Sequence, residues 1–376
     1  MEAKSKIYVA GHKGLVGSAL VRKLRAQGFH NLVLRTRQEL DLTRGYDVDE
    51  FFRVERPEYV FLAAAKVGGI HANSTYPVVF LLENLKIQSN VIEASWRHGV
   101  KGLLFLGSSC IYPKLAPQPL KEEYLLTGPL ECTNEPYAVA KIAGIELCEA
   151  YNRQFGTRFL SVMPTNLYGP NDRYDLETSH VLPAMIRKLH LAMLASQGEW
   201  DAVARDVSCH GPIPSEFATN LASIARHHGR QPPMELLSHG QSVIDPDPAV
   251  KLWGTGSARR ELLYSDDAAS ACIFLMRRLE GVFTGSNVPA ANGETSLAAR
   301  NLFNIGCGQD LTIRELAESI AAVIGFTGPI LWDNSKPDGT PQKLLDVSRI
   351  QALGWKPEVS LRDGVECAYM DYFTKE

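Results

Sequence analysis

The sequence predicts an α/β protein with a doubly wound parallel sheet and a smaller C-terminal α/β domain. Short apolar runs alternate with longer amphipathic patterns through the first half of the chain, and a glycine-rich turn follows the first run. Proline and glycine become frequent in the second half, which marks a change of organisation. Alternating strands and helices are typical of a parallel sheet covered on both faces. The 376 residues suffice for about two to three domains.

Each expected element rests on the periodicity of its apolar residues. We expect strands at residues 7–10, 32–34, 59–62, 102–106 and 159–163. We expect helices at residues 15–27, 76–98, 135–155, 266–279 and 312–324, and a further helical run that begins at His180. Residues 1–175 should form the first domain, to which parts of 255–310 return, and residues 176–376 should form mainly the second.

Residues 196–249 are polar, rich in histidine and only weakly periodic, so we expect an inserted helical lobe or a flexible excursion. Five potential metal ligands lie in this segment, but their spacing fits no common ligand pattern and we expect no metal. These residues are Cys209, His210, His227, His228 and His239.

Composition excludes several functional classes. Lys and Arg number 39 and Asp and Glu number 42, a net charge of −3, which does not favour a nucleic-acid or membrane-surface protein. The seven cysteines are an odd number without a C-x-x-C pair, so we expect reduced thiols in a cytoplasmic protein. We find neither a signal-peptide pattern nor an apolar run long enough to span a membrane.

The glycine-rich turn lies between the first expected strand and the first expected helix. Glycines permit a tight turn and close approach of a pyrophosphate, and the helix N-terminus adds unpaired N–H groups. This context favours a Rossmann-type dinucleotide site over the alternative, a purely structural turn. The residues of the turn are Gly11, His12, Lys13, Gly14, Leu15, Val16 and Gly17.

The second strand ends on basic residues, Arg35 and Arg37. An NAD site usually has an Asp or Glu there for the ribose 2′-hydroxyl, whereas arginine suits a 2′-phosphate. We therefore predict NADP(H) as the cofactor, with Lys13 as a second phosphate contact. The alternative is that these charges are solvated surface groups.

Tyr137 and Lys141 are four residues apart, which places them on one face of a helix. A nearby ammonium favours a phenolate, so we expect a lowered tyrosine pKa, suited to proton transfer at a carbonyl oxygen. Ser108 follows the fourth strand and should hydrogen-bond the same oxygen. The spacing is common by chance and a serine after a strand can be a simple turn; position in the fold favours the catalytic interpretation.

Together, the glycine turn, Ser108, Tyr137 and Lys141 resemble the extended short-chain dehydrogenase/reductases that act on nucleotide sugars. Within that family, the chain is most similar to the epimerase-reductases of GDP-4-keto-6-deoxy-mannose. The resemblance covers nearly the whole chain and departs from the pattern at residues 196–249 and 283–299. The matching stretches are residues 10–17, 63–70, 106–114, 133–144, 163–170 and 336–341.

The resemblance implies NADPH-dependent 3,5-epimerisation and 4-reduction of a GDP-linked 4-keto sugar. It implies that Cys110 and His180 are the acid/base pair for epimerisation, since thiol and imidazole both exchange protons near neutral pH. The alternatives are a small buried cysteine and a surface histidine at a helix start. Another nucleotide-sugar epimerase, reductase or dehydratase, or a non-catalytic NADP-binding scaffold, would share the fold.

The resemblance also implies binding positions and partners. It implies a homodimer formed through helices 76–98 and 135–155. Residues 196–249 lie between two segments that it places at the substrate, so we expect them to form a peripheral lobe flanking the sugar-nucleotide site. Cofactor positions beyond the turn and Arg37 are Asp41, Leu42, Leu106, Gly107, Ser109, Lys141, Pro164, Thr165, Asn166, Leu167 and His180. Substrate positions are Lys188, Trp253, Arg260, Asp338 and Lys343, where cations suit a diphosphate and an aromatic ring suits stacking.

Overall fold

The computed structural model describes residues 1–233, 247–285, 301–336 and 338–375. The chain divides into two compact units. The first consists of residues 1–167, 261–309 and 343–359, and the second of residues 168–260, 310–342 and 360–376. His239 and most of the 283–299 stretch lie outside the described residues.

The first unit is built on a six-stranded sheet with the order β2-β1-β3-β4-β5-β9. Every pairing along this order is parallel, and Ala10 of β1 lies opposite Leu62 of β3. The chain runs outward from β1 to β2 and then returns to the other side of β1, which makes a topological switch point between β1 and β3. The strands are β1 (Ile7–Ala10), β2 (Leu32–Val33), β3 (Tyr59–Leu62), β4 (Gly102–Leu106), β5 (Phe159–Pro164) and β9 (Leu302–Ile305).

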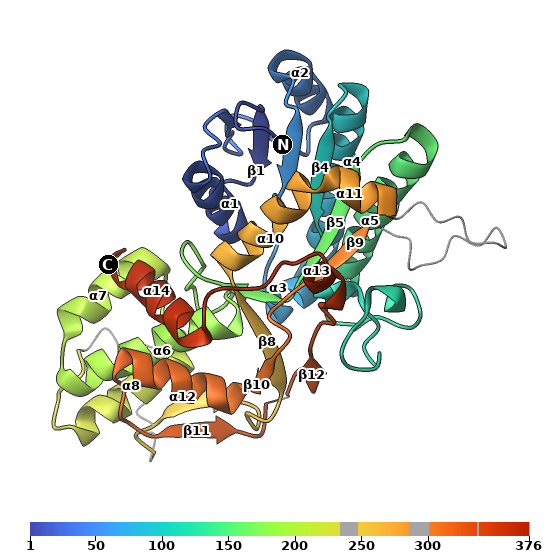
Figure 1. Cartoon of the computed structure of the whole chain (residues 1–376). Coiled ribbons are helices and arrows are strands. Elements are labelled where there is room, and N and C mark those ends of the chain that lie inside the picture. The colour runs from blue at the N-terminus through green and yellow to red at the C-terminus, as the bar shows by residue number, and fades with distance from the viewer. Residues whose placement is uncertain (234–246, 286–300, 337, 376) are drawn as a thin grey trace. The chain divides into compact units, whose positions relative to one another are not determined.

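Helices flank this sheet (Figure 1), α1 packing on α10 and α4 on α5. The α4–α5 contact contains an aromatic cluster in which the rings of Trp96 and Phe155 are 4.4 Å apart. It also contains a buried hydrogen bond of 2.6 Å from Gln88 to the Ala140 carbonyl. The helices are α1 (Leu15–Ala26), α2 (Gly45–Glu55), α3 (Ile70–Thr75), α4 (Pro77–Arg97), α5 (Glu135–Phe155), α10 (Ser265–Arg277), α11 (Leu279–Gly285) and α13 (Ser348–Ala352), with short 3-10 turns η1 (Ser109–Ile111) and η2 (Glu122–Tyr124).

The second unit is mainly helical. A two-stranded parallel sheet pairs β7 (Val250–Trp253) with β11 (Ile330–Asp333). The helices are α6 (Val181–Gln197), α7 (Trp200–His210), α8 (Ser215–His227), α12 (Ile313–Ile324) and α14 (Leu361–Phe373). A further sheet, in which β8 is central, includes residues of the first unit as well as of the second. Its short strands are β6 (Asn166–Tyr168), β8 (Arg259–Tyr264), β10 (Asp310–Thr312) and β12 (Gln342–Lys343).

The segment 196–249 contains α7 and α8, so the expectation of a helical lobe is confirmed for these two helices. Arg187 of α6 is fully buried and forms an ion pair of 2.8 Å with Asp206 of α7, which is buried as well. Tyr372 of α14 donates its hydroxyl proton to the same carboxylate. Asp206 therefore ties α7 to α6 and α14 inside the second unit, and breaking this buried pair would leave an unpaired charge.

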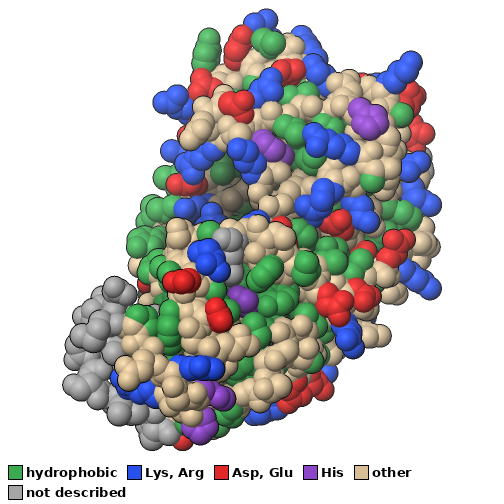
Figure 2. Space-filling view, turned by 90° about the vertical axis from the view of Figure 1, so that its left-hand side faces the viewer, with side chains coloured by type: hydrophobic (Ala, Val, Ile, Leu, Met, Phe, Trp, Pro, Cys, Tyr) green, Lys and Arg blue, Asp and Glu red, His purple; other side chains and the backbone are tan. Residues whose placement is uncertain are grey.

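The elements that the sequence predicted lie within two residues of their expected positions, but others, among them α2, α13, α14 and β9, were not anticipated. Only Val48 and Phe52 are buried on α2, so its amphipathic signal is short. Figure 2 shows basic and acidic side chains interspersed over the described part of one face of the molecule, in keeping with the near-neutral charge. Within the described residues, no helix combines the length and apolar character needed to cross a membrane.

Candidate functional site

The glycine turn places the N-terminus of α1 at the carboxyl end of β1. Gly11 has a φ of +80°, and a Cβ there would come within 2.8 Å of the Ala64 backbone. A Cβ on Gly17 would run into the Gly11 carbonyl oxygen, so the turn can close against the helix only with glycine at both positions. No side chain caps α1 at Gly14, and its first turn has no acidic residue. These features suit an anionic diphosphate.

His12 and Lys13 occupy the middle of this turn. The Nδ1 atom of His12 is buried and has no hydrogen-bond partner in the described structure. Burial, with a smaller contribution from Lys13, lowers the pKa of His12. Since a buried polar atom usually finds a partner, this orphaned nitrogen fits a site that a polar ligand completes.

The two arginines after β2 differ in availability. Arg35 donates a 2.6 Å hydrogen bond to Glu55 and another, of 3.0 Å, to the Leu34 carbonyl. The Arg37 side chain is 68% exposed, and within the described part of the chain its ion pair is a long contact of 3.6 Å with Glu83. Arg37 is therefore the arginine that can turn to a phosphate.

The other expected cofactor positions follow the carboxyl ends of neighbouring strands. Asp41 accepts hydrogen bonds from the backbone and side chain of Thr43, which lower its pKa, and Leu42 is buried. The Thr165 hydroxyl and the Asn166 amide donate to the Glu261 carbonyl, at 3.1 and 3.0 Å. Parallel strands end at one edge, so the loops after β1, β4 and β5 meet there. The last residues of β4 and β5 and the residues that follow them include Leu106, Gly107, Ser109, Pro164, Thr165, Asn166 and Leu167.

Helix α5 brings Tyr137 and Lys141 to the same edge. The helix begins with Pro136 in its first turn and ends at Gly156, whose φ of +65° stops it. The Nζ atom of Lys141 is buried and donates a 2.7 Å hydrogen bond to the Leu106 carbonyl. Burial lowers the pKa of Lys141 to about 7.

The expectation of a lowered Tyr137 pKa is wrong in this structure. Burial raises the pKa of Tyr137, the charge of Cys110 raises it further, and only a hydrogen bond from Ser108 opposes the shift. The Nζ atom of Lys141 lies 5.8 Å from the centre of the phenol ring and is directed to a carbonyl instead. Tyr137 is therefore a protonated donor, suited to give a proton to a developing alkoxide.

Cys110 lies in η1, where Ser108 caps the turn by accepting a 3.3 Å hydrogen bond from the Cys110 backbone. Its sulfur receives the Asn134 side-chain amide at 3.5 Å and the Lys343 ammonium at 3.6 Å. Asn134 is a residue that the sequence reasoning missed. Its position directly before α5, one residue ahead of Glu135-Pro136, is the available signal, since Asn favours helix starts.

The Oδ1 atom of Asn134 is buried without a hydrogen-bond partner in the described structure. A hydroxyl of a bound ligand would satisfy it. The first unit thus brings together Ser108, Cys110, Asn134, Tyr137 and Lys343.

The remaining predicted residues belong to the second unit. His180 is exposed and precedes α6 as its N-terminal cap residue. Lys188 of α6 lies over the Phe217 ring at 5.5 Å, and burial lowers its pKa. The structure therefore places these two residues on α6, in the unit that does not contain Cys110.

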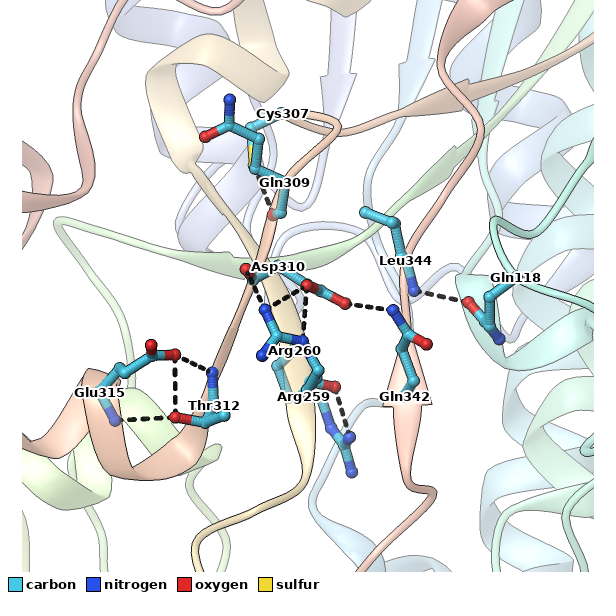
Figure 3. Close-up of polar contacts among 10 residues, drawn as sticks. All are labelled: Gln118, Arg259, Arg260, Cys307, Gln309, Asp310, Thr312, Glu315, Gln342 and Leu344. Atoms are coloured by element: carbon cyan, nitrogen blue, oxygen red, sulfur yellow. Dashed lines mark hydrogen bonds and ion pairs between the residues drawn. The ribbon is translucent and has the colours of Figure 1, made fainter.

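Trp253, Arg260 and Asp338 come together around the turn between β7 and β8. Asp338 accepts hydrogen bonds from the backbone and hydroxyl of Thr255, at 2.9 and 2.7 Å. Arg260 donates to the carbonyls of Arg259 (Figure 3) and Thr340. Trp253 is 62% exposed and has the Lys336 ammonium 5.4 Å from its ring centre. An exposed aromatic ring beside cations suits a nucleotide.

Known proteins resemble this chain in sequence and in fold. The sequence matches the profile of the NAD dependent epimerase/dehydratase family over residues 7–204 and 220–288. It is 49% identical to GDP-L-fucose synthase 1 of Arabidopsis thaliana, over 100% of this chain and 94% of that protein. It is 45% identical to GDP-L-fucose synthase of Escherichia coli strain K12, over 98% of this chain and 96% of that protein. A solved GDP-mannoheptose C4 reductase from Campylobacter jejuni with NADP bound is 38% identical, has a TM-score of 0.77 and covers 99% of each chain.

Proposed function

The chain belongs to the NAD dependent epimerase/dehydratase family, and from this premise we infer that it is a GDP-L-fucose synthase. It is an NADP-dependent enzyme that epimerises C3 and C5 of GDP-4-keto-6-deoxy-D-mannose and reduces the C4 ketone. The observation that supports this most strongly is the group of Ser108, Cys110 and Tyr137 around one point of the first unit. The two hydroxyls there can hydrogen-bond the C4 oxygen while the thiol exchanges a proton with the neighbouring carbon.

The ketone determines what the residues must do. The C–H bonds at C3 and C5 are acidic because they flank the C4 carbonyl, and removing either proton leaves an enolate on the C4 oxygen. Ser108 and Tyr137 hold that oxygen, and Cys110 and His180 exchange the protons. In the second step Tyr137 would protonate the alkoxide that develops on the same oxygen, when bound NADPH would supply the hydride to C4.

The cofactor and substrate positions follow from the chemistry of each group. The glycine turn and the α1 N-terminus would hold the cofactor diphosphate, and Arg37 would hold its 2′-phosphate. Lys188 and Arg260 would bind the GDP diphosphate and Trp253 would stack on the guanine or ribose. His180 would serve as the second acid/base group, since histidine titrates near neutral pH.

Arg37→Ala should weaken NADPH binding about 10- to 100-fold, because a charge-assisted hydrogen bond contributes about 1.5–3 kcal/mol. NADH binding should change little, since NADH has no 2′-phosphate. Titration of protein fluorescence with each cofactor measures both constants. Arg44→Ala removes another exposed arginine, of which the side chain is 73% exposed, and should leave both constants unchanged. Equal losses for the two cofactors would contradict the role of Arg37.

Incubation with GDP-4-keto-6-deoxy-D-mannose and NADPH, followed by NMR of the product, tests the function directly. GDP-L-fucose is expected, with inverted configuration at C3 and C5. A GDP-6-deoxyhexose reduced at C4 but unchanged at C3 and C5 would identify a C4 reductase instead. No consumption of NADPH would exclude both enzymes.

We also propose a homodimer formed through α4 and α5. Side chains at the start of α4 and on α5 are apolar and exposed: Tyr76 is 59%, Val78 70% and Val139 42% exposed. Two such helix pairs can bury these side chains in a four-helix contact.

Light scattering at micromolar concentration should therefore give about twice the chain mass of 41.5 kDa. Val78→Glu/Leu82→Glu should shift the protein towards the monomer, because carboxylates are costly to bury. Met370→Glu replaces an equally exposed apolar side chain on α14 and should leave the dimer intact. A monomeric parent protein would contradict the proposal.

A cytoplasmic location fits the thiols and the cofactor. All seven cysteines lie in the described residues, and each is a free thiol. A protein with exposed free cysteines such as Cys132 and Cys367 is suited to a reducing compartment.

A further inference from the structure

The Cys110 sulfur is the acceptor of two side-chain donors that approach from distant parts of the chain. The Asn134 amide nitrogen lies 3.5 Å from the sulfur and comes from the start of α5. The Lys343 ammonium lies 3.6 Å from it and comes from β12, 233 residues further along the sequence. All three residues belong to the first unit. Both contacts are stronger with a negatively charged sulfur than with a neutral one.

The position of Lys343 is fixed by the backbone that follows it. The Leu344 N–H donates to the Gln118 side chain at 2.9 Å (Figure 3), and the Leu344 carbonyl accepts from Leu120 at 2.7 Å. The next N–H, of Leu345, donates at 2.9 Å to the carboxylate of Glu261, a residue with 0% exposure. A chain held at two successive residues by buried or half-buried groups delivers its side chain to a defined place.

We propose that Lys343 is a positioning residue that, together with Asn134, stabilises the thiolate of Cys110 and so makes Cys110 the base of the epimerisation. This rests on the proposed function, because it assigns a direction to proton transfer in that reaction. The thiolate takes a proton from carbon: the C–H bond breaks, an S–H bond forms, and the electron pair moves to the C4 oxygen as enolate. Ser108 and Tyr137 then face the new negative charge.

The other groups around the sulfur do not replace Lys343. Tyr137 is the titratable group that faces Cys110 from α5, and burial keeps it protonated. Ser108 and Asn134 are neutral. Lys343 therefore supplies the positive charge among these groups, 3.6 Å from the sulfur, and a nearby positive charge favours a thiolate over a thiol.

Alkylation of Cys110 by iodoacetamide tests the proposal without substrate or cofactor. The thiolate displaces iodide from carbon, so the rate follows the thiolate fraction. The full chain carrying Cys132→Ser, Cys209→Ser and Cys367→Ser removes the three exposed thiols. Mass spectrometry of the Cys110 peptide then gives the rate between about pH 6 and pH 10, a range that brackets the usual thiol pKa.

Lys343→Met should raise the midpoint of this profile by about one pH unit or more and slow alkylation at neutral pH about tenfold. Lys343→Arg should restore most of the parent profile, since it keeps the charge. Asn134→Ala should give a smaller shift. Lys356→Met removes an exposed lysine of the same unit and should change nothing. If methionine prevents folding, Lys343→Gln should give the same raised midpoint and the same slower alkylation. A Lys343 variant that folds and keeps the parent profile overturns the proposal.

A second measurement separates this proposal from the proposed function. Lys343→Met should shift the pH profile of solvent-deuterium incorporation into the sugar in the same direction as the alkylation profile. A higher KM for the sugar with an unchanged alkylation profile would make Lys343 a phosphate contact and overturn the proposal. A further outcome is that Lys343→Met shifts the alkylation profile while the parent enzyme fails to convert GDP-4-keto-6-deoxy-D-mannose. That outcome would contradict the proposed function and support the role of Lys343.

Discussion

Cys110→Ser should slow solvent-deuterium incorporation at C3 and C5 by about 10²–10⁴-fold, the usual contribution of a positioned acid or base. A serine hydroxyl is a far weaker acid than a thiol, so its anion is scarce at neutral pH. Incorporation is measured by NMR in deuterated buffer without NADPH, so that only the epimerisation is observed. When NADPH is added, the variant should reduce the unepimerised ketone to a different GDP-6-deoxyhexose.

Cys132→Ser is the matched control, because Cys132 is exposed and its sulfur contacts only the neighbouring Glu131 at 3.6 Å in the described structure. It should exchange both protons at the parent rate. If Cys110→Ser incorporated deuterium at both carbons as fast as the parent, another residue near the ring would carry the proton transfers. Loss of exchange at one carbon alone would assign Cys110 to that carbon.

Tyr137→Phe should depress hydride transfer by a similar factor, about 10²–10⁴-fold, because the alkoxide at C4 loses its proton donor. The structure sharpens this expectation, since burial raises the pKa of Tyr137 and so keeps its proton available. Single-turnover oxidation of NADPH with a substrate already epimerised at C3 and C5 isolates this step. Cofactor binding should be retained, because the removed atom is a single hydroxyl oxygen.

Tyr112→Phe is the control for this variant. Its hydroxyl is also buried but donates a 2.6 Å hydrogen bond to Asn304. Its loss should lower the free energy of unfolding by about 1 kcal/mol and leave hydride transfer near the parent rate. An unchanged hydride-transfer rate in Tyr137→Phe would mean that Ser108 or water protonates the alkoxide.

Much of the fold could be predicted because its signals are local. Strands 7–10, 59–62 and 102–106 were predicted to the residue, since each is a short apolar run that the structure buries on both faces of the sheet. The helix at 135–155 has its own start and stop, Pro136 and Gly156. Strand β9 could not be predicted in this way, because its place beside β5 depends on pairing with a segment more than 130 residues away.

The candidate site could be predicted only in part. Ser108, Tyr137 and Lys141 follow from strand ends and helical spacing, and the family they indicate is confirmed by the comparisons. The pKa of Tyr137 was predicted to be lowered, but burial raises it. Spacing along a helix does not reveal that Lys141 donates to the Leu106 carbonyl. The roles of His180 and of the substrate residues stay predictions.

The sequence by itself determined the alternating α/β order and the glycine turn. It also predicted the preference for a 2′-phosphate and the candidate catalytic residues. These depend on periodicity and on the chemistry of neighbouring residues. Only the tertiary structure decided that Lys343 and Asn134 meet at the Cys110 sulfur, and that Asp206 of the unusual 196–249 segment pairs with Arg187 inside the second unit. Burial and charge pairing depend on residues that are distant in sequence, so a local sequence pattern does not predict them.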